Sequence, residues 1–182
     1  MAKVIAGMTM SLDGFIDADK VNPDFDELLA TPSFKKMIED TGAVIMGRHT
    51  YEMADPFTWV NETYEFQVPL FILTHTPPEK FPQGNDKLSV TFVTDGVASA
   101  ISQARKAAGD KIVQIIGGAD TIQQSLNSGL CDELWIDVMP VLLGKGLRLF
   151  ENIDTDKIKM QRENVETITS ARTGMIFRLI KE

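Results

Sequence analysis

Two short glycine-containing segments stand where the sequence is expected to pass from an apolar strand into a helix. They are Met46-Gly47-Arg48-His49-Thr50-Tyr51 and Ile116-Gly117-Gly118-Ala119-Asp120-Thr121. Glycine allows backbone N–H groups to approach a ligand closely, and a helix N-terminus presents unpaired donors with the positive end of its dipole. Two such turns on one sheet would hold the two ends of a dinucleotide.

The side chains of the first turn suit a phosphate group. Arg48 supplies a fixed positive charge, and the hydroxyl of Thr50 supplies a further donor. The alternative is that both turns are structural, because glycine and threonine are common in ordinary strand-to-helix turns. Neither turn has the glycine spacing of the usual dinucleotide-binding fingerprint. By themselves the two turns predict an α/β domain that tolerates anions.

A carboxylate near the N-terminus is the other candidate for chemistry. Asp13 follows the apolar run 4–8 and precedes Gly14, so it could orient a substrate or a water molecule. Asp-Gly is also a common turn dipeptide, and a purely structural role is equally open. His49 and His75 are far apart in the sequence and Cys131 is the single cysteine, so no metal site is predicted.

The composition limits the class of protein. With 182 residues, 43% hydrophobic and 24% charged, the chain is expected to fold as one domain over 1–182. A net charge of −8 argues against nucleic acid as a partner. No apolar run approaches the ~20 residues of a membrane span, and the N-terminus lacks the features of a signal peptide. We therefore expect a cytoplasmic protein that neither binds nucleic acid nor enters a membrane.

The elements that must position these residues follow from the apolar runs. Strands are expected at 4–8, 43–46, 70–73, 90–94 and 112–116, followed by three near 133–143, 157–168 and 172–181. Helices are expected to begin at Thr31-Pro32, Gly47, Asp95 and Gly118, whereas the acidic stretch 17–30 is expected to be irregular. This order predicts a three-layer α/β/α fold, whose mostly parallel central sheet gains antiparallel strands at its C-terminal edge.

Five segments, in matching order along nearly the whole chain, resemble a known superfamily. Residues 44–52, 71–77 and 115–119 are similar to the cofactor-binding segments of bacterial dihydrofolate reductases. Residues 10–16 and 140–150 look like the reductase domain of the riboflavin-pathway deaminase–reductase. The chain therefore resembles the dihydrofolate-reductase-like superfamily, and within it the riboflavin-pathway reductase domain most closely.

The resemblance implies an NADPH-dependent reductase that transfers a hydride to a small substrate similar to 5-amino-6-(5-phosphoribosylamino)uracil or to a pteridine. It places the cofactor across the carboxyl ends of the strands, and Asp13 is the residue that we expect to be catalytic. The residues expected to contact the cofactor are Gly47, Arg48, His49 and Thr50 at the first turn, Gly117, Gly118, Ala119 and Thr121 at the second, Thr74 and His75 beside the adenosine ribose, and the backbone near Ala6 and Ile16 at the nicotinamide. The riboflavin-branch resemblance and the run of C-terminal strands, whose edge needs covering, predict a homodimer.

Three positions depart from the family patterns. Thr31 stands near the position of a carboxylate that holds the pteridine in folate reductases, and Phe15 replaces a basic residue that is frequent in riboflavin-pathway reductases. Asp120 stands where folate reductases can carry a basic residue, so the preference for NADPH would rest mainly on Arg48. These departures leave a second interpretation open, in which the chain is a non-catalytic nucleotide-binding protein that retains the cofactor groove.

Overall fold

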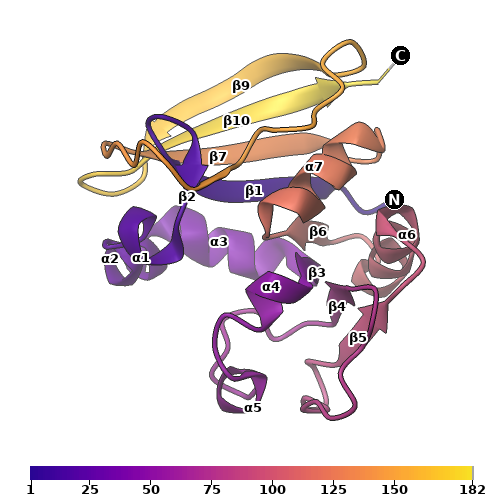
Figure 1. Ribbon diagram of the computed structural model, residues 1–182. Helices are drawn as coiled ribbons and strands as arrows, with labels where there is room; N and C mark the ends of the chain where they lie inside the picture. Colours follow the sequence, from indigo (N-terminus) through magenta and orange to yellow (C-terminus); the bar gives the residue numbers. More distant parts are fainter. Residues whose placement is uncertain (182) are drawn as a thin grey trace.

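An eight-stranded sheet forms the centre of the protein, with the strand order β5-β4-β3-β6-β1-β7-β10-β9 (Figure 1). The computed structural model describes residues 1–181, apart from the side chain of Ala18. The strands are β1 (Val4–Ser11), β3 (Thr41–Gly47), β4 (Leu70–Leu73), β5 (Val90–Val93), β6 (Ile112–Ile115), β7 (Glu133–Met139), β9 (Lys159–Thr167) and β10 (Thr173–Ile180).

The direction of the strands confirms the predicted mixed sheet. All pairings from β5 through to β7 are parallel, whereas β10 runs antiparallel to β7 and β9 runs antiparallel to β10. Both faces of β4 and β6 are covered, because consecutive residues are buried: residues 70–72 of β4 are at most 6% exposed and residues 113–115 of β6 at most 2%. The carboxyl ends of the parallel strands therefore meet at one edge of the sheet.

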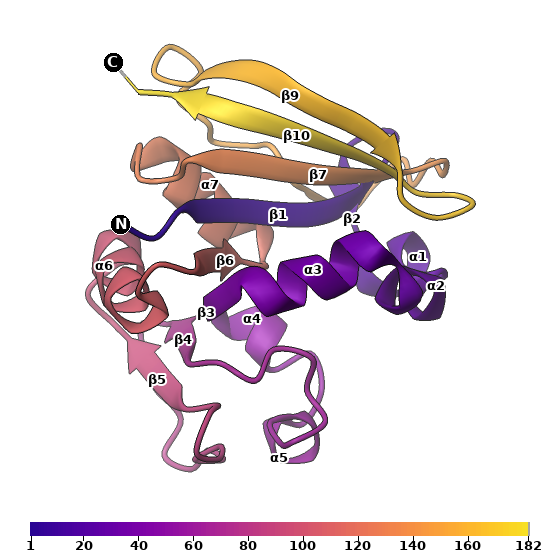
Figure 2. The same cartoon turned by 180° about the vertical axis from the view of Figure 1, so that it is seen from behind.

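Helices cover both faces of the parallel part, which confirms the three-layer arrangement. Helices α6 (Val97–Ala108) and α7 (Ala119–Asn127) pack on one face in one apolar core. Helix α3 (Pro32–Asp40) lies on the opposite face with a second core, together with the single turns α4 (Arg48–Tyr51) and α5 (Pro56–Trp59). Figures 1 and 2, which view the molecule from opposite sides, show α7 in front of the sheet in one view and α3 in front of it in the other.

Three of the four expected helix starts are observed, since Thr31, Gly47 and Gly118 are the N-caps of α3, α4 and α7. The start of α6 and the segment 17–30 differ from the expectation. Thr31 is the N-cap of α3, as predicted, and its Oγ1 accepts a hydrogen bond from the amide of Phe34 at 3.2 Å. The prediction that Asp95 caps α6 is wrong, because the N-cap is Gly96, whose φ of +99° favours glycine. Residues 17–30 are not irregular: they form α1 (Ala18–Val21), whose N-cap is Asp17, and α2 (Phe25–Ala30).

A small second sheet crosses the carboxyl edge of the main one. Strand β2 (Phe15–Ile16) pairs antiparallel with β8 (Leu147–Arg148). The sequence did not predict this pairing, since each strand has only two residues and the two lie far apart in the chain. No helix within residues 1–181 is long and apolar enough to cross a membrane.

Candidate functional site

The two glycine turns lie side by side at the carboxyl edge, because β3 and β6 are neighbours in the sheet. The amide of Gly47 donates a hydrogen bond to the carbonyl oxygen of Gly117 at 2.7 Å. A Cβ atom on Gly47 would lie 2.5 Å from Thr121 Oγ1, and one on Gly117 would lie 2.9 Å from Thr50 Oγ1. The φ of Gly117 is +134°, which side chains rarely allow. Both positions therefore need glycine for the turns to meet.

At position 118, neither a close contact of a Cβ atom nor a positive φ requires glycine. Its φ is −76°, and a Cβ atom there would meet a single atom within 4 Å, Thr50 Oγ1 at 3.6 Å. The backbone of Gly118 therefore borders space that the described protein atoms do not fill. Gly118 is also the N-cap of α7 and provides no side-chain acceptor for the amides of the first turn of that nine-residue helix. These are the features of a site where an anionic group can approach bare backbone.

At the first turn, side chains are better placed to bind an anion than the N-terminus of the helix is. Helix α4 has only four residues, so its dipole is small compared with that of α7. His49 is exposed and Thr50 is partly exposed at this turn. Any anion bound there would be held mainly by the side chains of residues 48–50.

Arg48 connects the first turn to the end of β4. Its guanidinium donates through Nε to Glu52 at 2.9 Å and through Nη1 to the carbonyl oxygen of Thr76 at 3.3 Å. Thr74 is buried, with its hydroxyl 3.1 Å from the same carbonyl oxygen, and His75 is exposed. The structure thus brings three of the predicted cofactor residues, Arg48, Thr74 and His75, into one region.

Strand β1 runs between the second turn and β7. The side chain of Ala6 is 0% exposed and belongs to the core on the α7 face, so only its backbone is available to a ligand. Met8, two residues closer to the carboxyl edge on the same face, has its Cε atom 3.8 Å from the position of a Cβ on Gly117. Sequence reasoning missed Met8, although the two-residue alternation of side chains along a strand could have placed it beside the turn.

Asp13 holds the loop that follows β7. Its Oδ1 accepts hydrogen bonds from the hydroxyl of Ser11 at 2.6 Å and from the amide of Leu143 at 3.1 Å, and its Oδ2 accepts one from the amide of Gly144 at 2.7 Å. These donors, the Ser11 hydroxyl first, lower the pKa of Asp13 to about 2. The carboxylate is therefore ionised at neutral pH and already engaged at both oxygens. Ile16 lies in β2 and pairs with Leu147 of β8, which follows this loop in the chain.

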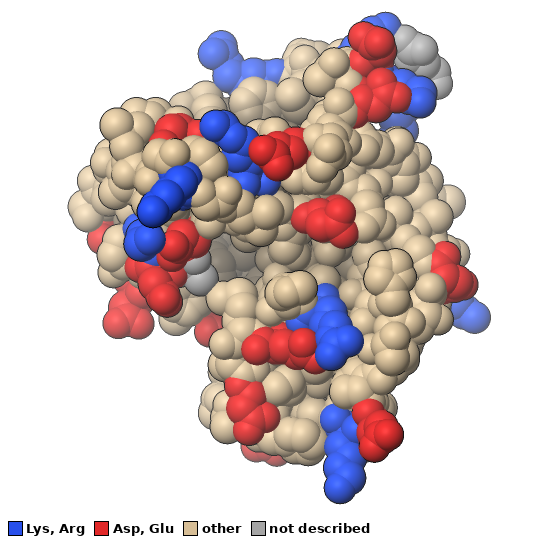
Figure 3. Space-filling view, in the orientation of Figure 1, with Lys and Arg blue, Asp and Glu red and all other residues tan. Residues whose placement is uncertain are grey.

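The space-filling view shows a hollow at this edge (Figure 3). In the common orientation of Figures 1 and 3, α1 and β2 lie on one side of it and α4 lies on the other. Acidic and basic side chains are interspersed around it, with no extended surface of one sign. The geometry provides an opening with mixed charge, bordered on one side by the turn that carries Arg48.

A buried ion pair joins the start of α2 to the residue that precedes β10, and sequence reasoning missed it. Arg172, 1% exposed in its side chain, pairs with Asp24 at 2.7 Å, and Glu27 accepts a hydrogen bond from the amide of Ser170 at 2.8 Å. The acidic stretch is therefore not uniformly solvated: the side chain of Asp24 is 8% exposed and ion-paired, whereas Glu27 is exposed. No local signal could have shown the pairing, since 148 residues separate Arg172 from Asp24.

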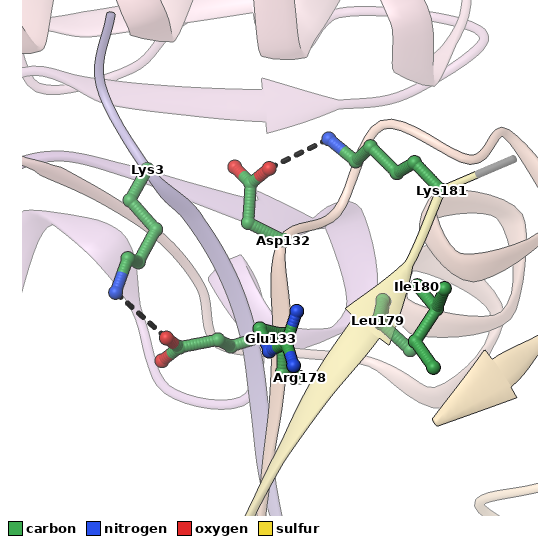
Figure 4. Close-up of a pocket in the computed structure, with 7 residues that line it drawn as sticks. All are labelled: Lys3, Asp132, Glu133, Arg178, Leu179, Ile180 and Lys181. Atoms are coloured by element: carbon green, nitrogen blue, oxygen red, sulfur yellow. Dashed lines mark hydrogen bonds and ion pairs between the residues drawn. The ribbon is translucent and has the colours of Figure 1, made fainter. Parts of the chain in front are cut away.

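A shallow pocket of about 360 Å³ lies at the opposite, amino-terminal edge of β1 and β7 (Figure 4). Four of its charged groups pair with one another, Lys3 with Glu133 at 2.7 Å and Lys181 with Asp132 at 2.6 Å, and Arg178 pairs with Glu163 at 2.8 Å. The pocket is remote from the glycine turns, and each charged side chain among its described lining residues already has an ionic partner. Within the described residues, no group of three or more His, Cys, Asp or Glu side chains is placed to hold a metal ion.

The fold is shared, over nearly the whole chain, with solved structures that are named for riboflavin biosynthesis or for its reductase. The chain is 27% identical to a putative riboflavin biosynthesis protein from Shewanella sp. PV-4, with each chain covered in full and a TM-score of 0.74. A diaminohydroxyphosphoribosylaminopyrimidine deaminase/5-amino-6-(5-phosphoribosylamino)uracil reductase from Thermotoga maritima shares the fold, with a TM-score of 0.66 at 18% identity over 98% of this chain and 57% of that protein.

A relative by sequence has no assigned activity. The uncharacterized protein YyaP of Bacillus subtilis (strain 168) is 23% identical over 96% of this chain and 94% of its own length. The model of one family, the RibD C-terminal domain, matches residues 2–172, which include both glycine turns, Asp13 and Arg172. This chain therefore belongs to the RibD C-terminal domain family, a reductase-like family with the fold that its sheet and helices display.

Proposed function

We propose that this protein is an NADPH-dependent reductase of a small heterocyclic substrate. The observation that carries the proposal is the meeting of the two glycine turns, where the Gly47 amide and the Gly117 carbonyl are 2.7 Å apart and Gly118 leaves space beside the N-terminus of α7. A side chain at Gly118 would occupy that space, which is the property expected of a surface that packs against a pyrophosphate. The residues present therefore fit the cofactor.

The proposed contacts divide between the two turns. Gly117, Gly118 and the first amides of α7 would face the pyrophosphate. Thr121 would pack against Gly47, since its Oγ1 lies 2.5 Å from the position of a Cβ atom on that glycine. Arg48, at the end of β3, would pair with the 2′-phosphate of the adenosine ribose, because its guanidinium already reaches the loop after β4 at the Thr76 carbonyl. The remaining predicted contacts, His49, Thr50, Thr74, His75 and Ala119 among them, stay predictions.

NADPH, when bound, supplies a hydride for the substrate carbon, and a proton completes the reduction. The chain's own task is to orient the two reactants and to exclude water from the reacting carbon. We propose that Asp13 serves this task by holding the loop at 143–144 through both carboxylate oxygens. With a pKa of about 2 it is a poor proton donor at neutral pH, so the proton would come from a group other than Asp13.

The substrate class follows from the family and not from a residue in the site. The Thermotoga maritima protein of the same fold is named for the reduction of 5-amino-6-(5-phosphoribosylamino)uracil, and we propose a related pyrimidine for this chain ahead of a pteridine. Thr31, the position expected for a pteridine-binding carboxylate, is fully used as the N-cap of α3, where its hydroxyl also donates to Leu28 O at 2.8 Å. This use of Thr31 disfavours a folate.

A second function, binding of a nucleotide without catalysis, is favoured by one observation. Both oxygens of Asp13, the residue expected to be catalytic, are engaged in holding a loop. The test that separates the two functions is NADPH oxidation, followed at its absorbance band, with a panel of pyrimidine, pteridine and quinone substrates. Oxidation with a pyrimidine supports the reductase; a raised melting temperature with NADPH but no oxidation with any member supports the binding protein.

We also propose that the protein is a homodimer that packs through one face of the β9–β10 hairpin. On the face shared with α7, Met160 and Val165 of β9 are each 49% exposed and lie opposite Leu179 and Met175 of β10. Figures 1 and 2 show no helix over this hairpin. The register shift near Ile176 and the charged residues of β9 disfavour pairing along its free edge, so we propose contact through the face.

A further inference from the structure

A buried guanidinium connects four separate segments of the chain. Arg172 precedes β10, and its Nε and Nη2 atoms donate to the two oxygens of Asp24 at 3.1 and 2.7 Å. Its Nη1 donates to Thr9 Oγ1 at 2.6 Å and to Asp137 Oδ2 at 3.1 Å, and Nη2 also donates to Asn22 Oδ1 at 3.0 Å. We call these five residues the Arg172 network.

The turn between β9 and β10 adds contacts to the same segment. Thr169 Oγ1 donates to Asp24 Oδ2 at 2.5 Å, while the amide and the hydroxyl of Ser170 donate to the two oxygens of Glu27 at 2.8 and 3.0 Å. Asp24 is the N-cap residue of α2, and Glu27 lies in its first turn. The turn between β9 and β10 therefore holds the segment that contains α1 and α2.

The charges in the network depend on one another. The side chains of Arg172 and Asp24 are 1% and 8% exposed, so loss of Arg172 leaves the buried Asp24 carboxylate without its charged partner, whereas loss of Asp24 leaves the guanidinium paired with Asp137 alone. Hydrogen bonds from Arg172 hold the pKa of the Asp24 carboxyl below its usual value, whereas burial raises the pKa of Asp137. The guanidinium thus favours one arrangement of the α1–α2 segment against the ends of β1 and β7.

This segment borders the hollow of the candidate site. In Figures 1 and 3, α1 lies on one side of the hollow and α4, the helix that contains Arg48, lies on the other side. We propose that Arg172 is a positioning residue: through Asp24 it fixes the α1–α2 segment as the wall of the hollow across from the cofactor turns. It acts on the substrate and leaves the cofactor unaffected. The substrate role rests on the reductase function proposed above.

Apolar anchors allow the network to be weakened without unfolding the segment. Val21 and Leu28 are buried, at 2% and 7% exposure, so we expect their apolar contacts to keep the segment folded when a polar contact is lost. Asp24→Asn keeps the size of the side chain and removes its charge. Glu163→Gln is the matched control, because it makes the same chemical change in an exposed ion pair, with Arg178 at 2.8 Å, on the same hairpin. Arg172→Lys is the second variant, which keeps the charge but loses the fork geometry.

Hydrogen exchange, trypsin digestion and kinetics together test the proposal. In folded Asp24→Asn we expect amide exchange over 17–30 and cleavage after Lys20, 66% exposed in its side chain, to be roughly tenfold faster or more. The dissociation constant for NADPH should stay within about twofold of wild type, while the KM for a pyrimidine substrate rises about fivefold or more with a smaller change in kcat. Arg172→Lys should lie between wild type and Asp24→Asn, and Glu163→Gln should match wild type.

Three results would overturn the proposal. Unchanged exchange over 17–30 in both folded network variants would show that Arg172 does not hold the segment. Faster exchange with an unchanged KM would show that the wall does not act on the substrate, and an equal loss of NADPH affinity would show that the effect is not confined to one side of the hollow. A wild-type protein that oxidises no substrate of the panel overturns the reductase function and with it the substrate role, while the exchange data still decide whether the network holds the segment.

Discussion

The carboxylate of Asp13 lies 2.7 Å from the amide nitrogen of Gly144, a residue 131 positions further along the chain. The pair joins the turn after β1 to the loop after β7, and the amide of Leu12 adds a hydrogen bond to the carbonyl oxygen of Val141 at 2.9 Å. Because the φ of Gly144 is +72°, glycine suits this position in the loop. Two segments that the sequence shows only as turns therefore form one structural unit at the carboxyl edge of the sheet.

This arrangement predicts a specific pH dependence. The pKa of Asp13 falls from 3.8 to about 2, so its ionised form supports the fold above about pH 4, and that support is lost as the pH falls toward 2. Between pH 5 and 8 its charge is constant, and no limb of a pH–rate profile should come from it. Asp13→Asn should speed amide exchange at Leu143 and Gly144 roughly two- to tenfold. A rate limb between pH 5 and 8 that disappears in Asp13→Asn would instead make this residue a proton donor.

The two glycines of the second turn should respond differently to substitution. At Gly118, a Cβ atom meets only Thr50 Oγ1, at 3.6 Å, and the side chain of valine would occupy the space proposed for the pyrophosphate. In Gly118→Val, NADPH affinity should therefore fall roughly tenfold or more with little change in melting temperature. Gly117→Ala should instead lower stability by about 1–3 kcal/mol, because φ is +134° and Thr50 Oγ1 lies 2.9 Å from the new Cβ. Fluorescence titration with NADPH beside thermal melts measures both. Retained affinity in Gly118→Val would remove the second turn from the site.

Arg48 should distinguish the two nicotinamide cofactors. Its guanidinium faces the loop after β4, and a 2′-phosphate is the group that NADPH has and NADH lacks. Arg48→Ala should weaken NADPH binding roughly tenfold and NADH binding less than twofold. Arg178→Ala removes an exposed arginine far from both turns, paired with Glu163 at 2.8 Å, and serves as the control. Equal losses for the two cofactors in Arg48→Ala would place this residue on the pyrophosphate.

The proposed dimer can be tested by two substitutions in β9 that point to opposite faces. Val165 lies opposite Met175 on the apolar face, and its neighbour Asn164 lies opposite Ile176 on the other face. Sedimentation equilibrium should give the mass of two chains for wild type and Asn164→Arg, and the mass of one chain for Val165→Arg. A wild-type monomer at micromolar concentration would contradict the dimer, and dissociation by Asn164→Arg alone would assign it to the other face.

Local patterns in the sequence determined the elements of this protein. Apolar runs bounded by glycine and proline predicted the strands, since a strand covered on both faces must be apolar at nearly every position, as 70–72 and 113–115 are, apart from Gln114. Thr31-Pro32 predicted the start of α3 because a cap depends on residues within one turn of the helix. The same patterns failed at 17–30, where charged residues form two short helices that are held by distant partners.

Only the tertiary structure decided which of these elements meet. The order β3-β6-β1 brings Gly47 against Gly117. The pairing of β7 with β10 brings Arg172 to Asp137, and α2 packs there so that Asp24 meets Arg172 across 148 residues. Periodicity carries no information about such contacts, because it fixes which way a side chain faces and not which strand lies beside it. The sequence therefore determined the layers and the two glycine turns, whereas strand order decided that the turns adjoin and that a buried arginine holds the wall of the hollow.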